Sequence, residues 1–177
     1  MRELLALCTL YEPASTVIEL GSPLCTRTTN IKAESYHRTD SGNADMLHDV
    51  LEGSAKYVEQ HKDWAHFDGN TWRLRNSAAA YKAARLVSAT RLHAAEIMPD
   101  ANDEQRTQKR KAMTFAYSCE NVAKITALLS LAAKDQRMLA SAEDFDSDPY
   151  LLGVKNGILN LKTGALMPAD KSQLISK

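Results

Sequence analysis

The feature that most constrains this fold is the segment DPYLLGVKNGILNLKTGALMPADKS, residues 148–172. Its short apolar runs are separated by Asn156-Gly157 and Thr163-Gly164, two pairs of residues that favour tight turns between antiparallel strands. Asn156-Gly157 in particular predicts a type I′ turn, in which both residues have a positive φ angle. The segment therefore predicts a small antiparallel β-structure, and it argues against a purely helical fold.

Helical periodicity dominates the sequence before this segment. Either Ser41 or Asn43 can cap a first helix that ends at Gly53, and its predicted buried face consists of Met46, Leu47, Val50 and Leu51. An Ala-rich helix is expected over 77–98, before Pro99, and another over about 103–117. A further helix is expected after Ser118 as its N-cap, with one apolar stripe made of Val122, Ile125, Leu128, Leu129, Ala132 and Ala133.

A β-hairpin is predicted between the first two helices. Asp68-Gly69 lies between two aromatic-rich runs, 64–67 and 72–74, so aromatic side chains should meet across the strands. The sequence thus predicts an α+β fold, a mostly helical domain with short antiparallel β-hairpins. Residues 13–41 hold two Pro and many Ser and Thr without a sustained period, which indicates an N-terminal arm or linker over 1–38 and a folded domain over 39–177.

The composition fits one ordinary domain. Apolar residues make up 44% of the 177 residues, enough for a hydrophobic core. No apolar run approaches the length of a membrane span, and residues 1–12 lack the features of a secretory signal. Cys8, Cys25 and Cys119 form no Cys-x-x-Cys pair, which indicates reduced thiols in a cytoplasmic protein rather than disulfides or a zinc site.

The usual motifs for catalysis and for metals are not matched. Gly164 to Ser172 resembles a phosphate-binding loop, but Asp170 stands where such a loop needs a Gly beside the phosphates. His61 and His66 would point to opposite faces of a strand, and no further ligand completes a metal site. We therefore expect no catalytic residue, no metal and no cofactor. An unrecognised enzyme site around the acidic loop 143–148 stays the least favoured hypothesis.

The charges are unevenly distributed along a chain whose net charge is zero. Residues 40–68 have a net charge of −5, residues 71–114 of +5, and residues 135–150 of −4. Clustered cations contact phosphates and a neighbouring aromatic ring can stack on a base, so a nucleic-acid interface is one interpretation and a solvated helix face is the other. The candidate interface residues are Trp72, Arg73, Arg75, Arg106, Lys109, Arg110 and Lys111.

Several segments together resemble a known family. TDSGNADML, WAHFDGNTW, VAKITALLSLAA and FDSDPYLLGVKNGILNLKTGALMPADKS are similar, in this order, to the domain immediately N-terminal to the superfamily 3 helicase in phage, plasmid and poxvirus primase–helicases. The resemblance covers about 39–177, and residues 1–38 show none. Two positions depart from the family pattern: Met46 replaces a basic residue and Asn160 replaces an Asp.

The resemblance implies a role in DNA replication. It implies that 148–177 leads into the ATPase, whose phosphate loop would follow Lys177, and that this chain is a natural short protein or a fragment. The expected function is non-catalytic: binding DNA, single-stranded or forked, and coupling the helicase to a primase module. The alternative is an assembly domain without direct DNA contact, in which opposite charges of neighbouring copies meet.

Overall fold

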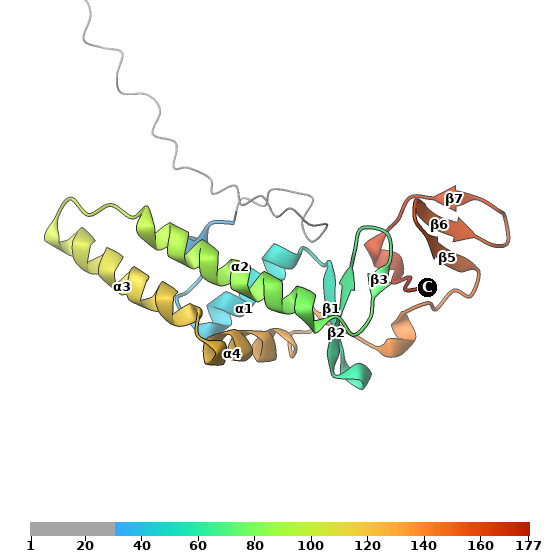
Figure 1. The fold of residues 1–177 in the computed structure, drawn as a ribbon, viewed down its shortest axis with the longest axis horizontal. Coiled ribbons are helices and arrows are strands. Elements are labelled where there is room, and N and C mark those ends of the chain that lie inside the picture. Colours follow the sequence, from blue (N-terminus) through green and yellow to red (C-terminus); the bar gives the residue numbers. More distant parts are fainter. Residues whose placement is uncertain (1–30) are drawn as a thin grey trace, which may run out of the picture.

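The structure is a computed structural model that describes residues 31–177. Four helices occupy one half of the molecule and two small sheets occupy the other (Figure 1). The α+β fold expected from the sequence is thereby confirmed. The predicted arm, 1–38, lies for the most part outside the described residues, and the structure shows only its last eight positions.

Helix α1, Asp40–Leu51, begins earlier than the sequence indicates. Its N-cap is Thr39, whose hydroxyl oxygen accepts a hydrogen bond from the Gly42 N–H at 3.0 Å. The caps predicted at Ser41 and Asn43 are wrong, because both residues lie inside the helix, and Asn43 is buried. The predicted apolar face is confirmed, since Met46, Leu47, Val50 and Leu51 are all buried.

Helices α2, Ser77–Glu96, and α3, Asp103–Cys119, form an antiparallel pair. Alanines at their contact (Ala95, Ala112 and Ala116) are buried, so the two backbones can approach closely. The side chain of Asn102 caps α3 by accepting from the Gln105 N–H at 2.8 Å.

Helix α4, Val122–Ala132, begins after Asn121 rather than after Ser118. The predicted Ser118 cap is wrong because α3 continues through Cys119, which is buried and whose carbonyl accepts a hydrogen bond from the Ser88 hydroxyl at 2.9 Å. The predicted apolar stripe is mostly correct. Ile125, Leu128 and Ala132 are buried, whereas Val122 is 70% exposed.

The first sheet has the strand order β3-β2-β1-β4. Its strands are β1, Ala55–Val58; β2, Asp63–Phe67; β3, Trp72–Arg73; and β4, Leu139–Ala140. The predicted hairpin at Asp68-Gly69 is confirmed, with Phe67 opposite Trp72 and their ring centroids 5.8 Å apart. β4 pairs with β1 in parallel, which the sequence did not indicate.

The second sheet is an antiparallel meander of β5, Leu151–Val154, β6, Gly157–Asn160, and β7, Leu166–Met167. The loop between β5 and β6 consists of Lys155 and Asn156, because Gly157 already pairs with Val154. The predicted type I′ turn is wrong, since Asn156 lacks a positive φ and Gly157 alone, at +145°, has one. Gly157 is required there for another reason: a Cβ would lie 2.1 Å from the Met167 carbonyl oxygen of β7.

The larger core lies between the helices and one face of the first sheet. It joins α1, α2 and α4 to Ala55 and Trp64. The other face of this sheet carries a smaller core of Val58, Ala65, Trp72 and Phe145. The first sheet therefore connects the helical half to the residues that follow α4.

Candidate nucleic-acid interface

The seven candidate residues fall into two separate groups. Trp72, Arg73 and Arg75 precede α2, at the end of that helix near the sheets, whereas Arg106, Lys109, Arg110 and Lys111 lie in the first half of α3, beside the opposite end of α2 (Figure 1). A 20-residue helix is about 30 Å long, so the two groups do not form one continuous patch.

Trp72 is unsuited to the base-stacking role predicted for it. The residue is 1% exposed, and its ring packs between Phe67 and Phe145. Its indole N–H donates to the Lys171 carbonyl at 3.0 Å. A base could reach this ring only if the small core opened, so the stacking prediction is corrected to a structural role.

Arg73 ends β3 and Arg75 follows it two residues later, and both are exposed. Arg73 Nε pairs with Asp68 Oδ2 at 2.6 Å. Burial alone would raise the pKa of Asp68, but the amide hydrogen bonds from Thr71 and Asn70, together with the Arg73 guanidinium, hold this pKa below its usual value. A phosphate would have to displace this carboxylate from Arg73.

The cations of α3 are also partly engaged. Arg106 pairs with Asp103 at 2.9 Å, and Lys109 pairs with Asp100 at 3.0 Å. Arg110 and Lys111 are exposed and take part in none of the ion pairs formed among residues 31–177. These two side chains and Arg75, which is likewise exposed and in none of these ion pairs, are therefore the predicted cations most available to donate hydrogen bonds to a phosphate.

Arg91, which contributes to the +5 charge of 71–114, is buried. Its guanidinium donates to the carbonyls of Ala33, Tyr36 and His37 at 2.6, 3.0 and 2.8 Å, and Nε donates to Asn43 Oδ1 at 2.9 Å. Arg91 thereby ties residues 33–37 to α1 and α2.

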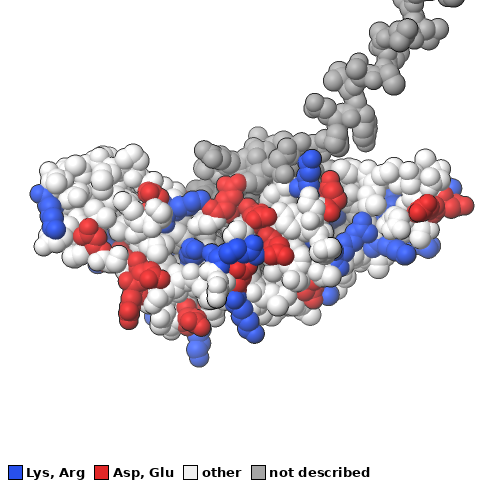
Figure 2. Space-filling view, turned by 180° about the vertical axis from the view of Figure 1, so that it is seen from behind, with Lys and Arg blue, Asp and Glu red and all other residues white. Residues whose placement is uncertain are grey.

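The charges that are segregated along the sequence are mixed in space. On the face shown in Figure 2, acidic and basic side chains lie beside one another along the length of the molecule. Ion pairs between distant segments explain part of this mixing: Lys124 pairs with Asp40 at 2.9 Å and Arg137 with Asp45 at 2.7 Å.

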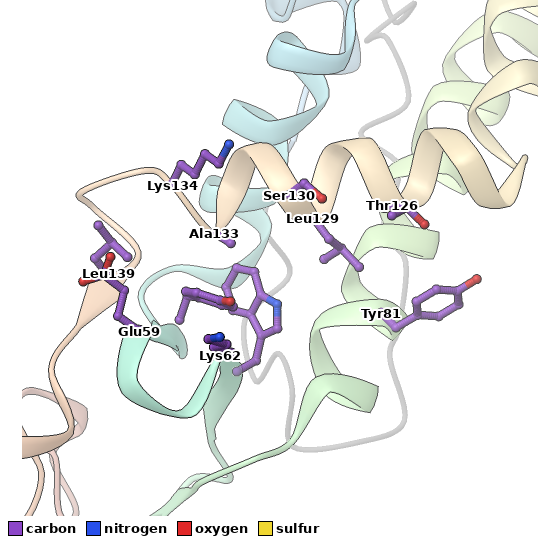
Figure 3. A pocket seen from close by; sticks show the side chains of 11 residues that line it. Glu59, Lys62, Tyr81, Thr126, Leu129, Ser130, Ala133, Lys134 and Leu139 are labelled. Atoms are coloured by element: carbon purple, nitrogen blue, oxygen red, sulfur yellow. The ribbon is translucent and has the colours of Figure 1, made fainter.

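A groove between α2 and α4, which sequence reasoning missed, collects cations and aromatic rings. Its first hollow, of about 730 Å³, lies between α4 and the β1–β2 hairpin and is lined by Tyr57, Lys62, Trp64, Tyr81, Leu129 and Lys134, among others (Figure 3). A second hollow, of about 670 Å³, shares Tyr81 and extends along α2 past Lys82 and Arg85. We call the two together the α2–α4 groove.

The groove could not be read from the sequence because its walls come from distant segments. Lys62 ends the β1–β2 loop, Tyr81 belongs to the second turn of α2, and Lys134 follows α4. Only the regular spacing of Tyr81, Lys82 and Arg85 on one helix face was visible as a signal.

The residues 171–177, called here the C-terminal segment, pack into the domain. The Trp72 N–H donates to the Ile175 carbonyl at 2.7 Å, and the Gly153 N–H donates to the Lys177 carbonyl at 2.6 Å. Asp146 accepts from the Ser176 N–H at 2.8 Å and from the Ser176 hydroxyl at 2.5 Å. Ile175 is 2% exposed, so this segment is packed into the folded domain.

The acidic loop 143–148 supplies local backbone contacts. Asp144 accepts from the Ser141 N–H at 2.7 Å, Asp148 accepts from the Tyr150 N–H at 2.9 Å, and Asp146 holds the C-terminal segment. Within 31–177 no cluster of three or more His, Cys, Asp or Glu is placed to hold a metal ion. The role of this loop in the structure is thus to fix turns.

The surroundings of Cys119 make its thiol a poor nucleophile. Its sulfur accepts from Asn43 Nδ2 at 3.3 Å, and burial raises the pKa of the thiol. Cys8 and Cys25 lie outside the described residues.

None of the helices found between residues 31 and 177 is both long and apolar enough to cross a bilayer.

Comparison with known families gives the decisive match. The family model described as D5 N terminal like matches residues 44–177. The chain belongs to this family. This family comprises the N-terminal domains of D5-like primase–helicase proteins of phages, plasmids and poxviruses, as the sequence motifs indicated. No curated protein and no solved structure matches the chain.

Proposed function

We propose that this D5 N-terminal-like domain is a non-catalytic DNA-binding and coupling domain of a phage- or plasmid-type replication primase–helicase, acting in the cytoplasm. The family match carries the proposal, because it associates the domain with proteins that work on replicating DNA. Its partners would be DNA and the helicase and primase modules of the parent protein.

The C-terminal segment supports the coupling part. If an ATPase follows this segment in the parent protein, its movement reaches the domain through the bonds to Asp146, Trp72 and Gly153. Several hydrogen bonds and a buried Ile175 make this connection stiff. A stiff connection transmits displacement, whereas a solvated linker absorbs it.

The free cations of α3 support the DNA-binding part. Arg110 and Lys111 point a positive charge at solvent, and Arg106 and Lys109 stand beside them with exposed acidic partners. Phosphate contacts of this kind position a strand without reading its sequence. Binding by one domain should be weak, and a ring of copies would strengthen it through effective concentration.

The test is charge reversal on α3. Arg110→Glu combined with Lys111→Glu should weaken binding of an oligonucleotide and reduce the slope of log affinity against log salt by about 1.4, since each contact with a single strand contributes about 0.7. Lys155→Glu, in the β5–β6 loop, is the matched control for a surface lysine. The measurement is fluorescence anisotropy. Unchanged affinity and salt slope in the α3 variant would show that α3 does not contact the DNA.

An assembly domain without direct DNA contact is the alternative. Exposed apolar side chains favour it: Tyr117 is 55% exposed and Val122 is 70% exposed, close together in sequence around the α3–α4 turn. Analytical ultracentrifugation separates the two functions. Self-association that Val122→Lys abolishes, in the absence of any salt-dependent DNA binding, would support the assembly function.

A further inference from the structure

We propose that the α2–α4 groove is a binding site for single-stranded DNA, in which bases stack on Tyr81 and Tyr57 while the phosphates lie near Lys62, Lys82, Arg85 and Lys134. The inference rests on the proposed function, because it names the form of DNA bound and the surface that binds it. None of these residues belongs to the interface predicted from the sequence.

The aromatic rings of the groove are placed for stacking. Tyr81 is 40% exposed and lines both hollows. Tyr57 is half-buried in the first hollow, where Trp64 supports it in an edge-to-face contact with ring centroids 5.4 Å apart. A supported but accessible ring is what a base requires, and it is what Trp72 lacks.

The cations of the groove are free, unlike Arg73, Arg106 and Lys109 of the predicted interface. Lys62, Lys82, Arg85 and Lys134 are exposed, and none takes part in an ion pair with any residue of 31–177. The acidic side chains that line the two hollows are Glu59 and Glu120. Four cations against two carboxylates favour an anionic occupant, and the rings favour nucleobases over an acidic peptide.

The arrangement of the side chains fits an extended strand. Figure 3 shows Tyr81 at one end of the first hollow beneath Thr126, and Glu59 and Leu139 at the other end, with Lys62 on the sheet side and Lys134 on the α4 side. Thr126 and Ser130 are exposed one turn apart on the same face of α4 and offer hydroxyl groups to base edges. Only an unpaired strand exposes its base faces to such a groove.

The experiment measures binding and position together. The 177-residue chain is titrated with oligo(dT) of about 16 nucleotides, the upper end of known site sizes for one domain, and with a duplex of the same length. A second oligonucleotide that carries a photoreactive 5-iodouracil is cross-linked, and mass spectrometry locates the modified residue. We expect cross-links at Tyr81 or Tyr57, and weaker binding of the duplex.

Variants of the groove sharpen the test. Tyr81→Ala should lower oligo(dT) affinity at least about five-fold, and Tyr81→Phe, which keeps the ring, should not. Lys62→Glu combined with Lys134→Glu should lower the salt slope by about 1.4. Lys155→Glu should change neither quantity. Thermal melts of each variant show whether the fold is kept.

Each other outcome would overturn the inference in a recognisable way. If the α3 variants weaken binding and folded groove variants do not, the strand lies on α3 and the proposed function stands without the groove. If the chain binds no oligonucleotide and Tyr81→Ala disrupts self-association, the groove holds protein and the DNA-binding function also fails. Equal affinity for single strand and duplex would exclude base stacking as the mode of binding.

Discussion

Arg91 joins several parts of this domain through one side chain. One guanidinium satisfies three backbone carbonyls and Asn43, and its carbon lies 5.7 Å from the centre of the Phe115 ring. We expect Arg91→Met to lower the free energy of unfolding by about 3 kcal/mol or more, because buried acceptors lose their donor. Arg91→Lys should restore little of this free energy, because an ammonium group cannot reproduce the planar arrangement of N–H donors in a guanidinium.

Urea denaturation of the two Arg91 variants is the measurement. A loss below about 0.5 kcal/mol in Arg91→Met, the range typical of surface positions, would show that residues 33–37 are not held in this way.

Tyr36 predicts a dependence of stability on alkaline pH. Burial and the hydrogen bond to Asp49, of 2.5 Å, raise the pKa of the Tyr36 hydroxyl to about 12. The unfolded state therefore loses this proton first, so the contribution of Tyr36 is complete below about pH 10 and is lost as the pH rises toward 12. In Tyr36→Phe, stability should fall less steeply as the pH rises through this range. Melting curves of both proteins over this range, compared pairwise, isolate the contribution of the Tyr36 hydroxyl.

Replacement of Gly157 should lower the free energy of unfolding more than replacement of the other glycines. Its φ of +145° and the nearby Met167 carbonyl leave no room for a side chain. Gly157→Val should destabilise by at least about 1–2 kcal/mol, and Asn156→Ala, in the same loop, should be much milder. Equal melting temperatures for Gly157→Val and the parent protein would mean that β6 and β7 do not pair as described.

At the scale of elements, the periodicity of the sequence predicted the helix face and the hairpin that depend on local spacing. It missed a strand pairing between segments far apart in the sequence. The apolar face of α1 and the hairpin at Asp68-Gly69 were predicted correctly, because both arise from local spacing. The parallel pairing of β4 with β1 was not, since Leu139 and Tyr57 are joined only after α4 returns the chain to the sheet. The same limit applied to the site: charge counting could not distinguish a buried Arg91 or paired Arg73 from a free Lys62.

Element packing also makes a prediction for the C-terminal segment. Asp146 has a φ of +52° and accepts two hydrogen bonds from Ser176. Asp146→Asn keeps a side chain that tolerates this backbone but loses the carboxylate, so the segment should open more often. Hydrogen exchange at the Trp72 and Gly153 amides, which donate to this segment, should speed up. Asp148→Asn should leave both rates unchanged, and protection retained in Asp146→Asn would show that the buried Ile175 alone holds the segment.

For the whole molecule, the packing of 164–172 argues against a phosphate-binding loop in this segment. The Asp170 carboxylate accepts the Ser172 N–H at 2.8 Å, which places a negative charge where a phosphate would need an amide donor. The Lys171 ammonium donates to the Glu52 carbonyl and is not free to approach a phosphate. We expect no ATP hydrolysis above the buffer rate and no rise in melting temperature with Mg²⁺ and ATP, since only a ligand of the folded state raises it. Turnover that follows the protein through purification and disappears in Lys171→Ala would contradict the proposed non-catalytic function, whereas DNA binding without turnover would agree with it.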